Sequence, residues 1–195
     1  MLIPLNKIIQ LLKEDNELLQ KFLSSFFCEQ DHDIETFLHE RAVNFERLSK
    51  ARTYLVCDAK ELQENTLENV TIYGYISLAL KTLYIPQSLS NRMRKELDGF
   101  SAKIHGEQIH DIPCYLIGQL GRNSQVSKEN LSGGELLQFA YDIIEASVQS
   151  VGGRYIMIEC KEDKKLVYFY KSHDFSEITR IPDGNCPMVQ MIRKI

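Results

Sequence analysis

The stretch S-G-G-E-L-L, from Ser132 to Leu137, marks the point where a polar loop becomes a helix. Ser132 followed three residues later by Glu135 has the spacing of a capping box, in which each side chain accepts a hydrogen bond from the backbone N–H of the other residue. The spacing predicts that Ser132 is the N-cap of a helix that begins at Gly133 and extends to Val151. Two residues without a Cβ would then form the start of the helix.

A helix that begins in this way is suited to a phosphate group. Its first N–H groups and the positive end of its dipole attract anions, and Gly133 and Gly134 would let a diphosphate approach the backbone closely. Many helices that begin with Ser-Gly-Gly bind nothing, so the motif alone leaves both interpretations open. Several basic residues of the C-terminal half would either assist an anion or be solvated surface. They are Arg122, Lys128, Arg154, Lys161, Lys164 and Lys165.

Length and composition predict one soluble domain with a full core. The chain has 195 residues, of which 44% are apolar and 26% charged, and no run reaches the roughly 20 apolar residues of a membrane span. Five scattered cysteines without a Cys-x-x-Cys pair, and no secretory signal pattern, favour a cytoplasmic protein without a metal site. The net charge of −4 disfavours a general nucleic-acid binder.

Apolar spacing predicts a mixed α/β (α+β) fold. Residues 1–27 are expected to form a helical extension, interrupted near Asp15, that packs on a single domain of residues 28–195. Pro113 to Arg122 is a nearly continuous apolar run and is expected to be the central strand. The remaining expected elements are helices over residues 31–50, 90–100 and 164–172, and strands over residues 52–58, 70–80, 154–160, 175–178 and 188–192.

Four motifs of the C-terminal half resemble the GCN5-related N-acetyltransferase family. They are L-I-G-Q-L-G-R (residues 116–122), S-G-G-E-L-L, I-M-I-E-C (residues 156–160) and F-Y-K-S-H-D-F (residues 169–175). The resemblance covers residues 28–195, and it implies a mostly antiparallel twisted sheet flanked by helices.

The resemblance also implies a binding site for acetyl-CoA as co-substrate. In this family pantetheine pairs with the end of the central strand, and amides of the following loop and helix start hold the pyrophosphate. The positions that match the strand end are Leu120, Gly121 and Arg122. Those that match the loop and helix start are Lys128, Leu131, Ser132, Gly133 and Gly134, with Leu131 in place of the usual first glycine.

The second family signature implies a catalytic tyrosine. Tyr170 matches the residue whose hydroxyl protonates the leaving thiolate. Tyr168 lies two positions away, about 200° around a helix, so only one of the two hydroxyls can serve. Asp163 stands where an asparagine often begins this helix, and Asp174 replaces the usual glycine, at a position where φ is expected to be positive.

The leading functional hypothesis is an N-acetyltransferase that moves acetyl from acetyl-CoA to a primary amine of a small molecule or protein, by direct attack in a ternary complex. No general base is identified from the sequence. A base or a water chain is expected opposite the thioester, and Glu107, Asp111 and Gln119 could contribute to it, although each is also typical of a surface or loop residue.

Two alternatives remain open. F-C-E-Q-D-H-D-I-E-T-F-L (residues 27–38), T-Y-L-V (residues 53–56) and I-Y-G-Y-I-S-L (residues 72–78) are similar to toxin acetyltransferases that act on aminoacyl-tRNA. An antitoxin partner would then be expected, and Arg92, Arg94 and Lys95 would contact the acceptor stem. The acidic net charge argues against tRNA.

The third hypothesis is a non-catalytic acyl-CoA-binding module. Pairing of an edge strand such as Met188 to Ile192 would give a homodimer.

Overall fold

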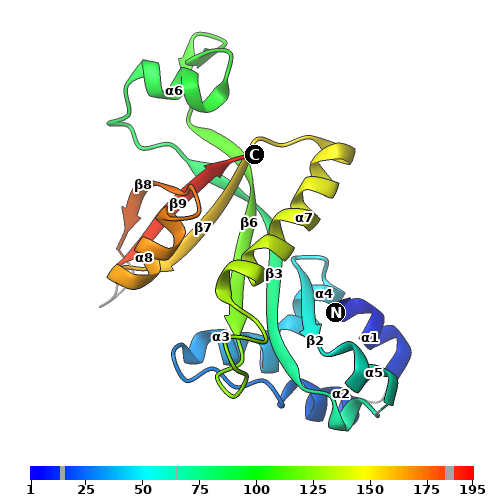
Figure 1. Ribbon diagram of the computed structural model, residues 1–195. Helices are drawn as coiled ribbons and strands as arrows, with labels where there is room; N and C mark the ends of the chain where they lie inside the picture. Colours follow the sequence, from blue (N-terminus) through cyan, green and yellow to red (C-terminus); the bar gives the residue numbers. More distant parts are fainter. Residues whose placement is uncertain (14–15, 65, 183–186) are drawn as a thin grey trace. The chain divides into compact units, whose positions relative to one another are not determined.

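The computed structural model describes residues 1–13, 16–64, 66–182 and 187–195. One seven-stranded sheet has the order β1-β2-β3-β6-β7-β9-β8, and β4 and β5 form a small separate hairpin (Figure 1). β6 (Asp111–Arg122) is fourth of the seven strands, which confirms the predicted central strand. The pairs β1–β2, β2–β3, β7–β9 and β8–β9 are antiparallel, as expected for a mostly antiparallel sheet.

The chain divides into two compact units. Unit 1 comprises residues 1–79 and 117–147, and unit 2 comprises residues 80–116 and 148–195. The long strands β3 (Ile72–Tyr84) and β6 contribute to both, and α7 (Gly133–Val151) begins in unit 1. The other elements of unit 1 are β1 (Leu2–Pro4), α1 (Leu5–Leu12), α2 (Asn16–Leu23), α3 (His32–Thr36), the π-helical turn η1 (Phe37–Arg41), α4 (Ala42–Arg47), β2 (Arg52–Cys57), α5 (Ala59–Glu64) and the 3₁₀ turn η2 (Leu67–Asn69).

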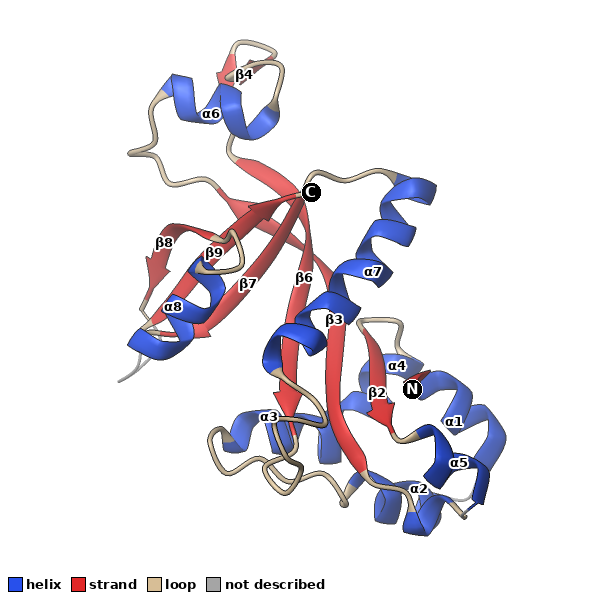
Figure 2. Ribbon diagram, in the orientation of Figure 1, coloured by secondary structure: helices blue, strands red, loops and turns tan. Residues whose placement is uncertain are grey.

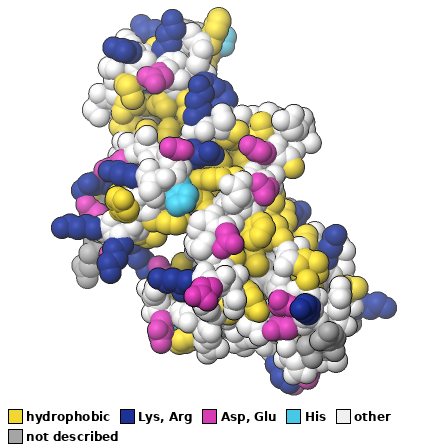
Figure 3. Space-filling model, in the orientation of Figure 1, with side chains coloured by type: hydrophobic (Ala, Val, Ile, Leu, Met, Phe, Trp, Pro, Cys, Tyr) yellow, Lys and Arg dark blue, Asp and Glu magenta, His cyan; other side chains and the backbone are white. Residues whose placement is uncertain are grey.

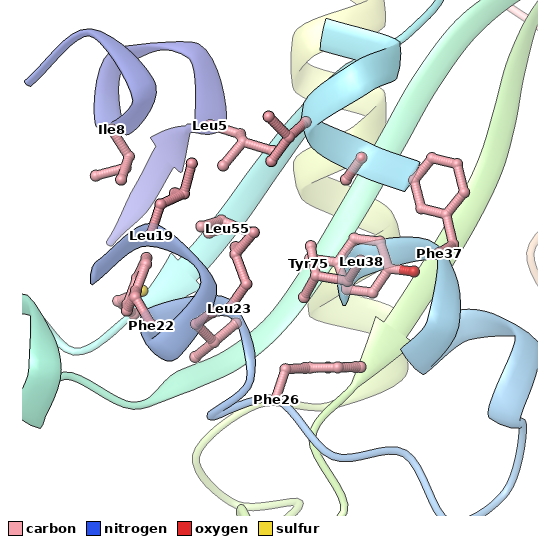
Figure 4. Packing of buried hydrophobic residues seen from close by; sticks show 14 of the residues in the cluster. Leu5, Ile8, Leu19, Phe22, Leu23, Phe26, Phe37, Leu38, Leu55 and Tyr75 are labelled. Carbon is pink, nitrogen blue, oxygen red and sulfur yellow. The ribbon is translucent and has the colours of Figure 1, made fainter. Parts of the chain in front are cut away.

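Unit 1 has helices on both faces of its strands. Successive residues of a strand point to opposite faces. Tyr75 therefore faces a core built with α1, α2, η1 and α4, where Phe26 and Phe37 pack around it (Figure 4). Its neighbour Gly74 faces Leu131 and Leu136 at the start of α7. β3 therefore packs directly against the residues around the start of α7.

The N-terminal 50 residues follow the predicted pattern with two differences. The expected helix over residues 31–50 is α3, η1 and α4 in succession, with a π-helical turn that the sequence did not indicate. The N-terminal segment forms α1 and α2, but it is preceded by β1, which pairs with β2 and was not expected. The division into residues 1–27 and 28–195 stays a prediction, and the expected interruption near Asp15 lies outside the described residues.

Unit 2 contains the remaining elements. They are α6 (Asn91–Asp98), β4 (Lys103–Ile104), β5 (Glu107–Gln108), β7 (Tyr155–Lys161), α8 (Lys164–Lys171), β8 (Ser176–Ile181) and β9 (Met188–Lys194) (Figure 2). The order of β6, α7, β7, α8, β8 and β9 is the order expected from the sequence. The prediction that Met188 to Ile192 is an edge strand is wrong, because β9 lies between β7 and β8. The last strand along the chain is thus inserted inside the sheet, and β8 takes its edge.

The hairpin formed by β2 and β3 also differs from expectation at its tip. No element was expected between the strands predicted over residues 52–58 and 70–80, whereas the structure places α5 and η2 there. Asp58 begins α5, because its carboxylate accepts hydrogen bonds from the backbone N–H groups of Lys60 and Glu61, at 2.7 and 3.2 Å. Leu62 and Leu67 then pack against the core of unit 1.

Candidate functional site

The predicted capping box is present at the start of α7. The backbone N–H of Glu135 donates to Ser132 Oγ at 3.1 Å, and the backbone N–H of Ser132 donates to Glu135 Oε2 at 2.8 Å. The Ser132 hydroxyl donates to the same carboxylate oxygen at 2.6 Å. These bonds fix Ser132 as the N-cap and Gly133 as the first helical residue, as predicted.

We call Ser132, Gly133 and Gly134 the helix-start site. Within the described residues, the backbone N–H groups of Gly133 and Gly134 have no protein acceptor. They can therefore donate to an anion at the positive end of α7, a helix of 19 residues. The Glu135 carboxylate lies at the same end, and its hydrogen bonds from the Ser132 hydroxyl and backbone hold the pKa of Glu135 below its ordinary value. The site thus combines two available donors with one negative charge.

Leu131, which stands where the resemblance expects a glycine, is part of the core. Its side chain is 3% exposed and lies over Gly74, where an added Cβ would be 2.7 Å from Leu131 Cδ2. The φ angle of Leu131 is not positive, so this position does not require a glycine. Its backbone N–H donates to Ser127 O at 3.4 Å. Leu131 anchors the loop immediately before the helix-start site.

The strand end that precedes this loop is closely packed by protein. A Cβ on Gly121 would lie 2.4 Å from Ile34 Cγ2 and 3.1 Å from Phe26 Cζ, so the absence of a side chain is already explained by neighbouring residues. The Arg122 guanidinium donates to the carbonyl oxygens of Asn123 and Val126, and thus shapes the loop. Leu120 is half-buried, and Lys128 is exposed in the loop.

The two candidate tyrosines, Tyr168 and Tyr170, both lie on α8 in unit 2 and differ in exposure. Tyr170 is 7% exposed and packs edge-on against Phe169 and Phe175, with ring centroids 5.1 and 5.5 Å away. Tyr168 is 74% exposed. The expectation that the two hydroxyls face different sides is therefore confirmed. A proton donor for a thiolate has to lie in a site that excludes bulk water, which favours Tyr170 over Tyr168.

The two aspartates that depart from the family pattern have structural roles. Asp163 is the N-cap of α8, since its Oδ1 accepts from the backbone N–H groups of Lys165 and Leu166, each at 2.9 Å. Asp174 has φ of 66°, the positive value expected at this position. It follows α8 and precedes Phe175, whose backbone N–H donates to Tyr170 O at 3.1 Å. A role of Asp163 in cofactor binding stays a prediction.

The expected group of Arg92, Arg94 and Lys95 is not a continuous exposed patch. Arg92 and Lys95 are exposed on α6, but Arg94 is 0% exposed. Its guanidinium donates to four backbone carbonyls, those of Pro86, Gln87, Leu89 and Ile109. Arg94 therefore holds residues 85–110 together and cannot contact a partner. Figure 3 shows that exposed Lys and Arg side chains gather over α6 and over α8.

The described cysteines are not suited to nucleophilic chemistry. Cys28, Cys57, Cys114 and Cys160 are buried and unpaired. Burial raises the pKa of the Cys57 thiol to about 12 and the pKa values of the Cys114 and Cys160 thiols to about 11. A thiolate is the reactive form, so these side chains stay inert near neutral pH.

The predicted site residues fall into two groups. Those around the helix start and the end of β6 lie in unit 1, whereas Asp163 and Tyr170 lie in unit 2. Two of the three general-base candidates, Glu107 and Asp111, are exposed, and Gln119 is half-buried. Asn123 and Ser124 were not predicted as site residues, and both bond the loop after β6 to other segments of unit 1. Asn and Ser directly after an apolar strand were the signal that could have found them.

No protein-family model and no curated protein sequence matches the chain. Solved structures do match. The complex "AtaT complexed with acetyl-methionyl-tRNAfMet" is similar with a TM-score of 0.61 and 20% identity, over 86% of this chain and 85% of that chain. AtaTR bound with AcCoA has a TM-score of 0.59 and 21% identity, over 86% and 84%. A Tyr-to-Phe mutant of KacT has a TM-score of 0.62 and 16% identity, over 86% and 85%.

Among the described residues, no helix is both long and apolar enough to cross a membrane. The sheet order, the flanking helices and the structural matches agree with the architecture expected from the sequence motifs. The chain has the fold of the GCN5-related N-acetyltransferases, in the form shared with the toxin AtaT and with KacT.

Proposed function

We propose that the protein is an acetyl-CoA-dependent N-acetyltransferase whose acceptor is the amino group of an aminoacyl-tRNA. The observation that carries the first part is the helix-start site. There α7 begins, after the central strand and its loop, with two glycine N–H groups that have no acceptor in the described part of the protein. This arrangement suits the diphosphate of CoA, because an anion gains both from the two donors and from the helix dipole.

The proposed reaction needs one proton donor on this chain. The acceptor amine would attack the thioester carbonyl, so that a C–N bond forms, the C–S bond breaks and the thiolate takes up a proton. Tyr170 would supply that proton from its hydroxyl, since its buried ring is fixed by Phe169 and Phe175. The proton that the amine loses would pass to water, because Glu107 and Asp111 are exposed and the Gln119 amide is not basic.

The comparisons favour an aminoacyl-tRNA acceptor over the small amine ranked first from the sequence. AtaT occurs in a complex with acetyl-methionyl-tRNAfMet, and the AtaT–AtaR pair is a toxin with its antitoxin. Exposed cations on this chain offer phosphate contacts, among them Arg92 and Lys95 on α6 and Lys164 and Lys165 on α8. An antitoxin partner would follow from the same proposal.

A small-molecule or protein amine is the second candidate, and the net charge of −4 is the observation that favours it. Electrostatic contacts to tRNA weaken steeply with salt, whereas transfer to a small amine does not depend on phosphate contacts. Initial rates with charged tRNA and with a panel of primary amines, each at 50 and 200 mM salt, would separate the two acceptors. Acetyl-CoA binding without turnover on either would indicate the non-catalytic module instead.

Calorimetric titration of acetyl-CoA tests the cofactor part without any acceptor. We expect micromolar binding by the native protein and none by Gly133→Glu, because the new side chain adds bulk and negative charge where the diphosphate would lie. The matched control is Gln138→Glu, which adds the same charge at an exposed position further along α7 and should keep its affinity. Equal affinity of Gly133→Glu and native protein would refute the proposed site.

A further inference from the structure

The loop that follows β6 is bonded to the segment between α2 and α3. The backbone N–H of Ser124 donates to Phe27 O at 2.8 Å, and the backbone N–H of Glu29 donates to Ser124 Oγ at 3.0 Å. Both segments belong to unit 1, although 95 residues separate Glu29 from Ser124 in the sequence. Ser124 thus links residues 24–31 to the loop that ends at the helix-start site.

Asn123 fixes the root of this loop. It is fully buried, its side-chain amide donates to Ser25 O at 3.1 Å and to Ile72 O at 2.8 Å, and its backbone N–H donates to Tyr73 O at 2.8 Å. A buried residue with so many partners is structural, since its removal would leave several groups unpaired. Ser124 differs from Asn123 in two ways. It is half-buried, and its two bonds, to Phe27 and from Glu29, both join the loop to residues 24–31.

Residues 24–31 in turn lead into α3. Asp31 begins this helix by accepting a hydrogen bond from the backbone N–H of Asp33 at 3.1 Å, and the backbone N–H of Cys28 donates to Glu35 Oε2 at 2.8 Å. Phe26 and Cys28 of this segment are buried in the core of unit 1. Phe27, Glu29 and Gln30 are exposed, and exposed connections open first in native proteins. The positions of Phe27 and Glu29 therefore depend on bonds to their neighbours, and Ser124 supplies one to each.

We propose that Ser124 is a positioning residue that couples the helix-start site to residues 24–31, so that binding of acetyl-CoA at the one orders the other. This inference rests on the proposed function. A ligand that fixes the loop also fixes the partners of Ser124, and the ordering of residues 24–31 becomes part of the binding free energy. Coupling is reciprocal, so a change in residues 24–31 alters the affinity for acetyl-CoA by the same factor.

Hydrogen exchange with and without acetyl-CoA tests the coupling. In the native protein, acetyl-CoA should slow exchange in residues 24–31 as well as in residues 123–134. Ser124→Ala removes the bond from Glu29 and keeps the backbone bond to Phe27. The slowing at Glu29 and the residues beside it should therefore diminish while that in residues 123–134 remains, and calorimetry should give an affinity about fivefold weaker. The matched control is Ser101→Ala in unit 2, whose hydroxyl bonds to the backbone of Lys103.

The possible outcomes distinguish this inference from the proposed function. Native protein that binds acetyl-CoA without any change in residues 24–31 overturns the coupling alone. Ser124→Ala that keeps both the native affinity and the native exchange pattern also overturns it, as does a lowered melting temperature with an unchanged ligand response. Native protein that does not bind acetyl-CoA overturns the proposed function together with this inference.

Discussion

Leu131 and Gly74 form a complementary pair in unit 1. The space that a Cβ would occupy on Gly74 is taken by Leu131 Cδ2, 2.7 Å from that point, and the backbone oxygen of Gly121 lies 2.9 Å from it. Leu131 stands where the family resemblance expects a glycine, and Gly74 on β3 leaves room for its side chain. Leu131 ties the loop before α7 to the sheet through this contact.

Gly74→Ala is expected to lower the free energy of unfolding by about 1–3 kcal/mol, because a methyl group at this site overpacks a buried contact. Leu131→Ala is expected to cost about 2–5 kcal/mol through the cavity it leaves. Urea denaturation of both variants and of the double variant measures these changes. The double variant should lose less than the sum of the two, since the shorter side chain relieves part of the overpacking. Strictly additive losses would show that the two residues do not depend on one another.

Arg94 is expected to matter for stability and not for tRNA binding. Arg94→Met should lower the free energy of unfolding by more than about 3 kcal/mol, because several buried carbonyls lose their donors at once. Arg94→Lys should recover only part of this, since an ammonium cannot reach all four carbonyls. Urea denaturation of the two variants gives the comparison.

Arg92 is the matched exposed residue on the same helix. If the acceptor is tRNA and α6 contacts it, Arg92→Ala should leave the free energy of unfolding unchanged. It should lower the slope of log affinity against log salt concentration by about one. A salt titration of tRNA binding measures this slope. An unchanged slope would exclude Arg92 from the interface, and a destabilised Arg92→Ala would contradict its exposed position.

Much of the fold was predictable because its signals are local. The capping box, the αL position of Asp174 and the apolar central strand each depend on a few neighbouring residues, and all three are present as expected. The insertion of β9 between β7 and β8 and the pairing of β1 with β2 were not predictable in this way. They depend on which distant strand offers a free edge, and strand composition does not encode that choice.

The candidate site shows the same division. The role of Gly121 in ligand binding stays a prediction. Its sequence context did not indicate that Ile34 and Phe26, which are distant in the sequence, occupy the space where a Cβ would lie. Arg94 was grouped with exposed cations because helical spacing cannot reveal that carbonyls of the preceding residues 86–89 and of Ile109 surround its guanidinium. The prediction that the side chains of Tyr168 and Tyr170 face different sides of α8 was correct. A separation of two positions along a helix sets this difference in direction, whatever the tertiary contacts are.

Tyr170→Phe is expected to leave acetyl-CoA binding unchanged and to lower kcat by about 100-fold, the usual effect of removing a general acid. Steady-state kinetics with the identified acceptor and calorimetry with acetyl-CoA give the two values. Tyr168→Phe is the control, because its hydroxyl is on the exposed side of α8 and its loss should change neither. Equal kcat for native protein and Tyr170→Phe would remove Tyr170 from the mechanism, and weaker binding by Tyr170→Phe would indicate a packing role instead.

Glu135 is expected to link the stability of the α7 start to acid pH. Its hydrogen bonds with Ser132 lower its pKa in the folded protein below the ordinary value of 4.5. A carboxyl whose folded pKa is lowered stabilises the protein above its unfolded pKa, and this contribution is lost as the pH falls through the folded value. Glu135→Gln keeps an acceptor for the Ser132 N–H and does not titrate. Melting temperatures between pH 6 and pH 3 should therefore fall more for the native protein than for Glu135→Gln.

The same variant is expected to bind acetyl-CoA more tightly at low salt. Glu135 places a negative charge at the helix end where the diphosphate would lie, and Glu135→Gln removes it while keeping the N-cap. A charge near a helix N-terminus has a modest, salt-screened effect, so we expect an affinity about threefold higher at 20 mM salt and nearly equal affinities at 500 mM. Calorimetry at both salt concentrations measures this. Weaker binding by Glu135→Gln at low salt would mean that the carboxylate orients the loop for the ligand, which would outweigh its repulsion of the diphosphate.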